Sequence, residues 1–203
     1  MIHHGAMGSS RDVPGQGYIA PALNRGWLVC VFNRRGHARR LTRSNFNFFG
    51  ATEDVQTAIA AIRSLRPNAL LLNIGLSVGS GLLVRYFGDR GIDNEFVAGV
   101  GVCPGYNIET CMDAVEEPYA SLLLSSAKSF HLKKNQELLQ SCGGYETCLE
   151  ARSFQAFLDA SYHMAGFESK EDYYAATNPM RVARNIATPL LIINSEDGTY
   201  LKF

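Results

Sequence analysis

The chain has 203 residues, of which 46% are hydrophobic and 19% are charged, so it is long enough to bury one sizeable core. Nineteen basic and nineteen acidic residues give a formal net charge of zero, which excludes a global field that would attract nucleic acid. Because no apolar run reaches the roughly 18 residues of a membrane span, we expect one soluble domain over residues 1–203 with no nucleic-acid partner.

The first half of the chain pairs an apolar run suited to a strand with a helical period. Residues 27–32 (WLVCVF) predict a strand, and residues 52–65 (TEDVQTAIAAIRSL) predict a helix with Thr52 as its N-cap. The expected buried face of that helix carries Val55, Ile59, Ile62 and Leu65. This strand and helix form the first α/β unit.

Three further strands follow the same pattern. Residues 69–74 (ALLLNI) and 96–102 (FVAGVGV) predict buried strands, and residues 189–194 (PLLIIN) predict another, which begins at a proline. A helix from about Gly79 joins the first two, and its expected core residues are Leu82, Leu83, Tyr86 and Phe87. Apolar strands joined by long crossovers predict a parallel sheet covered on both faces, so the fold class is α/β.

The segment at about 108–188 is much longer than a single crossover requires. It carries helical patterns at 119–139 and 153–167. We expect extra helices over the carboxyl edge of the sheet, where open α/β sheets bind ligands. The alternative is that these helices serve packing alone.

The sequence holds five cysteines, namely Cys30, Cys103, Cys111, Cys142 and Cys148. They form neither a C-x-x-C pair nor an even disulfide set. Cys142 and Cys148 are close enough in sequence to pair locally. We expect free thiols instead, in a reducing compartment.

The stretch from Asn73 to Gly91 (NIGLSVGSGLLVRYFGDRG) carries the main chemical motif. It is not a phosphate loop, because that motif needs a lysine and none lies between Gly75 and Gly91. A dinucleotide fingerprint also fails, because Val84 stands where its third glycine is required. The motif that fits is the nucleophile elbow G-x-S-x-G at residues 75–79, between a predicted strand and a predicted helix.

The elbow predicts Ser77 as a nucleophile. Its turn forces the serine into a strained backbone conformation, and the glycines at 75 and 79 avoid collisions with the neighbouring helix and strand. The turn would present the hydroxyl at the carboxyl edge of the sheet and direct the backbone N–H of Val78 toward a developing oxyanion.

A second oxyanion donor is expected from residues 3–8 (HHGAMG), because a His-Gly pair often marks the loop that supplies it. Gly5 would let the backbone turn, so that the N–H of Ala6 or Met7 faces the substrate carbonyl. The alternative is a frayed terminus with two unrelated histidines.

Together these stretches resemble the α/β-hydrolase superfamily, in its branch of abhydrolase-domain phospholipases, acylglycerol lipases and short-chain esterases. The resemblance is carried, in family order, by residues 3–10 (HHGAMGSS), 31–36 (VFNRRG), 51–59 (ATEDVQTAI), 75–81 (GLSVGSG), 166–179 (GFESKEDYYAATNP) and 188–197 (TPLLIINSED). It implies a partial α/β-hydrolase fold with a helical lid insertion at about 108–188. It also implies hydrolysis of carboxylic esters of lipids through an acyl-enzyme on Ser77, without metal or cofactor, by a monomer acting on a small lipid or ester.

The resemblance further implies a triad acid and a histidine base after the last strand. Gly198 stands where the family carries its acid, so we assign the neighbouring Asp197 as the acid. No histidine follows Asp197, and the remaining candidates for the base are His37, His131 and His163. Each of these is also explained as a surface or core-edge histidine.

The missing base suggests two outcomes for function. Since Met1 and Ile2 are all that remains of the strand before the His-Gly loop, we expect a fragment or truncated gene product with weak or missing activity. An oxyanion hole and a binding site can still leave residual catalysis. The alternative is a catalytically inactive hydrolase-like protein that binds or regulates.

The loop at residues 33–43 (NRRGHARRLTR) carries five arginines, namely Arg34, Arg35, Arg39, Arg40 and Arg43. They can meet lipid phosphates or an anionic membrane surface, or they can form an ordinary solvated loop. The location therefore stays open between the cytoplasm and a peripheral membrane contact.

Overall fold

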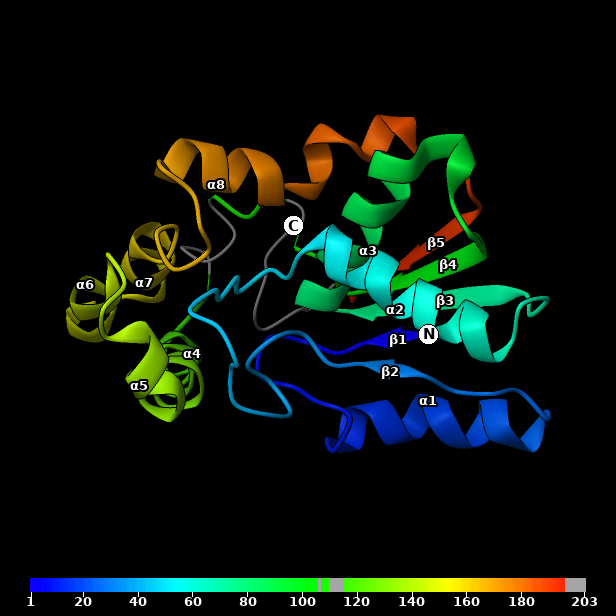
Figure 1. Cartoon of the computed structure of the whole chain (residues 1–203), viewed down its shortest axis with the longest axis horizontal. Helices are drawn as coiled ribbons and strands as arrows, with labels where there is room; N and C mark the ends of the chain where they lie inside the picture. The colour runs from blue at the N-terminus through cyan, green and yellow to red at the C-terminus, as the bar shows by residue number, and fades with distance from the viewer. Residues whose placement is uncertain (106, 110–114, 196–203) are drawn as a thin grey trace.

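The computed structural model describes residues 1–105, 107–109 and 115–195, with the backbone alone for residues 13–16. Within these residues all strand pairs are parallel, and one five-stranded sheet runs in the order β2-β1-β3-β4-β5 (Figure 1). The strands are β1 (Ile2–His3), β2 (Val31–Phe32), β3 (Leu71–Leu76), β4 (Phe96–Val102) and β5 (Leu190–Ile193). The predicted α/β class is confirmed.

The first predicted strand is much shorter than expected. Residues 27–30 lie outside β2, although the Cys30 carbonyl still accepts a hydrogen bond from the Ile2 amide at 2.8 Å. Trp27 is 52% exposed and Leu28 is 69% exposed, so neither is buried as the predicted strand required. β4 matches its predicted range, and β3 begins two residues later than expected and continues to Leu76.

Helices α2 (Thr52–Leu65) and α3 (Val78–Arg90) lie on one face of the sheet, and α1 (Val13–Asn24) lies on the other (Figure 1). Helices therefore lie on both faces, as predicted, but the face of α1 is only partly covered by the described residues. Among these residues α1 is the only long helix on its face (Figure 1). Strand side chains that stay exposed include Leu72, Leu191 and Ile193.

Helix α2 matches its predicted range, but its N-cap and one of its expected core residues differ from the prediction. The N-cap position belongs to Ala51, and Thr52 is the first helical residue, so the predicted Thr52 cap is wrong. Val55 and Ile59 are buried as expected. The predicted burial of Leu65 is wrong, since its side chain is 72% exposed.

Between β4 and β5 the chain forms several short helices, as its length predicted. They are α4 (Tyr119–Ala127), a π-helix (Lys128–Leu132), a 3-10 turn (Lys133–Asn135), α5 (Gln136–Leu139), α6 (Tyr145–Glu150), α7 (Phe154–Ala160), α8 (Lys170–Thr177), and 3-10 turns at Pro179–Arg181 and Ala183–Asn185. Helices α4 to α7 lie beyond the carboxyl ends of the strands (Figure 1). We call residues 115–185 the helical segment.

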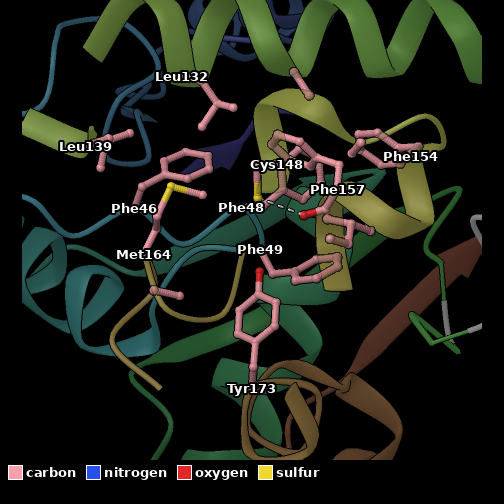
Figure 2. Close-up of a cluster of buried hydrophobic side chains, with 14 of the residues drawn as sticks. Phe46, Phe48, Phe49, Leu132, Leu139, Cys148, Phe154, Phe157, Met164 and Tyr173 are labelled. Atoms are coloured by element: carbon pink, nitrogen blue, oxygen red, sulfur yellow. Dashed lines mark hydrogen bonds between the residues drawn. The ribbon is translucent and has the colours of Figure 1, made fainter. Parts of the chain in front are cut away.

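Side chains of the helical segment and of the loop after β2 together form one hydrophobic core. Phe46, Phe48 and Phe49 from that loop are almost fully buried among side chains of the segment (Figure 2). The cluster also holds Leu132, Leu139, Cys148, Phe154, Phe157, Met164 and Tyr173. This aromatic loop therefore ties the helical segment to the sheet layer, in addition to the packing of residues 179–185 on α3.

The start of α3 packs backbone against backbone at two glycines. A Cβ at Gly75 would lie 2.6 Å from the Ser80 Cα, and a Cβ at Gly79 would lie 2.5 Å from the His3 carbonyl oxygen. Real Cβ contacts of this length do not occur, so only glycine fits at either position. This agrees with the reason that the elbow motif gave for both glycines.

Replacement of Gly79 by alanine should destabilise the fold. The added methyl would meet the His3 and His4 carbonyl oxygens, which belong to rigid backbone, so we expect a loss of about 2 kcal/mol or more in the free energy of unfolding. Urea unfolding measures it. Gly81→Ala in the same helix is the matched control, because its Cβ would meet only Pro179 at 4.0 Å. Equal stability of the two variants would contradict the packing argument.

Candidate active site

Ser77 occupies a strained turn between β3 and α3. Its φ is 51° and its ψ is −119°, a region that a residue with a side chain rarely adopts and that costs about 1–3 kcal/mol. Its amide donates to the Val102 carbonyl at 2.8 Å, and its carbonyl accepts from the amides of Ser80 and Gly81 at 2.8 and 3.4 Å. The residue is exposed at the carboxyl edge of the sheet.

Ser80 supports this turn from within the protein, and sequence reasoning missed it. The buried hydroxyl donates to the Gly75 carbonyl at 2.7 Å and accepts from the Val102 amide at 3.1 Å. It therefore ties the ends of β3 and β4 to the start of α3. A polar residue inside an otherwise apolar helical face was the signal that could have revealed it.

The loop after β1 lies against Ser77. A Cβ built at Gly5 would be 3.6 Å from the Ser77 Cβ. His3 and His4 are 0% and 5% exposed, and β1 lies between β2 and β3, so the first residues are not a frayed terminus. The structure thus brings the loop at residues 4–8 next to the elbow.

Three backbone amides near Ser77 stand out because they are unused. The amide of Val78 opens α3 and has no acceptor in a preceding helical turn. The amides of Ala6 and Met7 donate no hydrogen bond within the described part of the chain. These are the three donors that the sequence predicted for the oxyanion.

A small pocket opens beside Ser77. Its lining is mostly apolar, with one buried cation, and consists of Phe49, Ser77, Val78, Gly81, Leu82, Arg85, Gly105, Ile108, Thr177 and Pro179. Arg85 binds the carbonyls of Phe49 and Gly50 at 3.4 and 3.1 Å. Burial lowers the Arg85 pKa to about 10.

The arginines of residues 33–43 do not form one surface. Arg34 is 2% exposed and points inward, where it binds backbone carbonyls of the loop at residues 4–8. Arg35 pairs with Asp54 at 2.6 Å and donates to Asn45 at 3.0 Å. Only the three later arginines of the loop, Arg39, Arg40 and Arg43, are exposed without an ion pair among the described residues.

Three histidines lie in a buried row beside Arg34. The ring centroids of His4 and His37 are 4.7 Å apart, those of His37 and His131 are 4.8 Å apart, and His131 stacks on Phe46 at 4.5 Å. Burial, reinforced by the Arg34 charge, lowers the pKa of His4 to about 2 and of His37 to about 4. These rings are therefore neutral near pH 7.

None of the histidines predicted as alternative bases bonds to Ser77 within the described residues. His37 faces the carbonyls of Arg35 and Ala6 at 3.0 and 2.9 Å, and His131 has no hydrogen-bond partner in that part of the chain. His163 is exposed, and its ring lies against that of Tyr162.

The predicted acid, Asp197, lies outside the described residues, as do Gly198 and Cys111. The other four cysteines are free thiols. In the described ranges, no group of three His, Cys, Asp or Glu side chains is placed to hold a metal ion. No described helix is long and apolar enough to cross a bilayer.

Comparisons with known proteins agree with this geometry. A sequence model of the alpha/beta hydrolase fold matches residues 1–126. The chain is 28% identical over 182 residues to "Phospholipase ABHD3" of Homo sapiens, covering 86% of this chain and 44% of that protein. It is 25% identical over 199 residues to "Monoacylglycerol lipase ABHD2" of Homo sapiens, covering 89% of this chain and 47% of that protein. The chain thus spans about half the length of these relatives.

A solved structure supports the fold alone. The crystal structure of bromoperoxidase from Bacillus anthracis superposes with a TM-score of 0.51 at 18% sequence identity. The match covers 100% of this chain and 75% of that one.

The buried histidine row predicts acid lability. Rings that stay neutral in the fold but bind a proton in the unfolded chain reduce stability as pH falls below about 6.5, by about 1.4 kcal/mol per pH unit for each ring. His131→Phe should flatten this dependence and leave the fold at least as stable at pH 7, because neither ring nitrogen of His131 has a described partner. Urea unfolding between pH 7 and pH 5 measures both effects. An unchanged slope in the variant would contradict the account.

Proposed function

Because the chain belongs to the α/β-hydrolase fold family, in the branch of abhydrolase-domain phospholipases, acylglycerol lipases and esterases, we propose that it is a lipid-directed hydrolase of carboxylic esters. The observation that carries this proposal is the strained turn of Ser77, with the loop at residues 4–8 against it. A strained serine at a strand-to-helix turn, next to free backbone amides, is the arrangement that acyl transfer needs.

In the proposed reaction the Ser77 hydroxyl attacks the ester carbonyl and forms an acyl-enzyme that water then hydrolyses. The negative oxygen of the tetrahedral intermediate would accept hydrogen bonds from the amide of Val78 and from Ala6 or Met7. A base must take the serine proton, and Asp197 is the proposed acid that orients it. None of the described histidines forms a hydrogen bond to Ser77, so none of them is supported as the base.

The surroundings of Ser77 favour an apolar acyl group. Phe49, Leu82 and Ile108 line the pocket beside it, and Thr177 and Pro179 close it from the end of the helical segment. Apolar walls with a few polar atoms at one end suit a fatty acyl chain whose carbonyl meets the serine. We propose that the helical segment acts as a lid over this site.

A second candidate function is a hydrolase-like protein that binds without catalysis. The observation that favours it is the burial of His4, His37 and His131 in a neutral row that makes no hydrogen bond to Ser77. Such a protein would keep the pocket and the oxyanion donors but would lack proton transfer. Serine reactivity separates the two functions.

We also propose a peripheral contact with an anionic membrane through a basic surface, defined as Arg39, Arg40, Arg43 and Lys133. The loop that carries the arginines is fixed to residues 133–135, since the Leu41 amide donates to Asn135 at 2.8 Å. All four cations are exposed. Exposed apolar side chains on the same helical segment, Leu122 and Phe130, suit insertion among lipid head groups.

The nucleophile assignment is tested with a fluorophosphonate probe. The wild-type chain should be labelled at one residue, and Ser77→Ala should abolish labelling, because the probe reacts with an activated serine. Mass spectrometry of the labelled peptide measures it. Ser64→Ala, an exposed serine on α2, is the control and should label as the wild type does.

The outcomes separate the two candidate functions. Labelling that persists in Ser77→Ala would overturn the nucleophile. A folded wild-type chain that does not react would contradict the hydrolase and favour the binding protein.

The basic surface is tested by co-sedimentation with phosphatidylcholine vesicles, with and without phosphatidylserine. Binding should need the anionic lipid and weaken with salt, and Glu at positions 39, 40 and 43 together should reduce it at least about tenfold. A matched control replaces three exposed arginines elsewhere, Arg25, Arg66 and Arg184, by Glu. Equal losses in both triple variants would show a net-charge effect and contradict the proposed surface.

A further inference from the structure

The buried guanidinium of Arg34 binds three successive carbonyl groups of the loop after β1. Its Nη1 donates to the His4 carbonyl at 2.6 Å, and its Nη2 lies 2.7 Å from the Gly5 carbonyl and 3.2 Å from the Ala6 carbonyl. The His37 ring touches the same group, with its Nε2 at 3.2 Å from Arg34 Nη2 and at 2.9 Å from the Ala6 carbonyl.

No carboxylate balances this cation. Among the described residues Arg34 forms no ion pair, and its burial alone lowers its pKa to about 9. A buried charge without a counter-ion is costly unless dipoles surround it. Here the carbonyl dipoles of residues 4–6 take that role, so the charge and the loop conformation depend on each other.

The carbonyl contacts also fix the direction of the loop amides. In a trans peptide group the C=O and the N–H point in opposite directions. Because the carbonyls of His4, Gly5 and Ala6 turn toward Arg34, the amides of Gly5, Ala6 and Met7 turn away from it. None of these amides donates to an acceptor in the described part of the chain.

We infer that Arg34 is a positioning residue that sets the oxyanion loop: by holding three carbonyls, it directs the amides of residues 5–7 away from itself, in the loop that contacts Ser77 at Gly5. The catalytic part of this inference rests on the proposed ester hydrolysis, whereas the orientation of the loop does not. The pattern N-R-R-G gave no sign of this role, because Arg34 and Arg35 look alike in sequence but only Arg34 turns inward.

The orientation is tested by amide hydrogen exchange of the intact chain, read by mass spectrometry over residues 3–9. Arg34→Met keeps the length of the side chain but removes every donor, so exchange of the bonded amides in this peptide, such as that of Gly8, which donates to the Gly5 carbonyl at 3.3 Å, should rise about tenfold or more while α2 stays protected. Arg85→Met is the matched control, because Arg85 is equally buried and binds carbonyls of residues 49 and 50. Exchange that is unchanged in Arg34→Met, or raised as much in Arg85→Met, would overturn the inference.

The catalytic consequence is tested with the fluorophosphonate probe and a nitrophenyl ester. Arg34→Met should slow labelling of Ser77 about 10²-fold and lower kcat with little change in KM, because the aligned donors act mainly on the transition state. Arg34→Lys keeps the charge and should recover part of the rate. A rate equal to that of the wild type in Arg34→Met would contradict the role.

Hydrogen exchange and serine reactivity distinguish a failure of the inference about the loop from a failure of the hydrolase proposal. If the wild type does not react at all, the hydrolase proposal fails and hydrogen exchange still decides the orientation of the loop. If Arg34→Met does not fold, Arg34→Lys decides in its place: exchange over residues 3–9 must rise, and an unchanged value would overturn the inference.

Discussion

The site depends on the close approach of three backbones around Ser77. The end of β3, the start of α3 and the end of β1 meet where a Cβ at Gly75 or Gly79 would overlap main-chain atoms. This contact leaves no room for the serine to relax to an ordinary turn, so its positive φ is imposed by its neighbours. The same contact places the loop at residues 4–8 against the serine, so packing brings the proposed nucleophile next to the loop that carries the proposed oxyanion donors.

The protein maintains several unfavourable local states in one small region. Ser77 is strained, Arg34 carries a charge without a carboxylate, and His131 is buried with no described partner for its ring nitrogens. Each costs free energy that must be offset elsewhere, and the aromatic cluster of the helical segment adjoins the histidine row, since Phe46 stacks on His131. Local costs that persist around one exposed serine are typical of a functional site.

The sequence predicted the features that depend on local pattern. The strand at 96–102, helix α3 with its buried face, and the two glycines of the elbow follow from apolar periodicity and from a motif with a steric cause. Helix α1 was not predicted, because Pro14, Pro21 and the nearby glycines interrupt the apolar period of a helix. The length of β2 and the exposure of Leu65 depend on what covers each element, which no local window contains. The inward orientation of the Arg34 side chain was not predicted for the same reason, since the carbonyls that it binds lie some thirty residues away in sequence.

The most direct test of the central claim is a crystal structure of the chain with an alkyl boronic acid, which forms a tetrahedral adduct with a reactive serine. The account predicts a bond to the Ser77 oxygen, with one boronate oxygen about 2.7–3.1 Å from the amide nitrogen of Val78 and from that of Ala6 or Met7. An adduct at another residue, or a Ser77 adduct whose oxygens all face solvent, would contradict it.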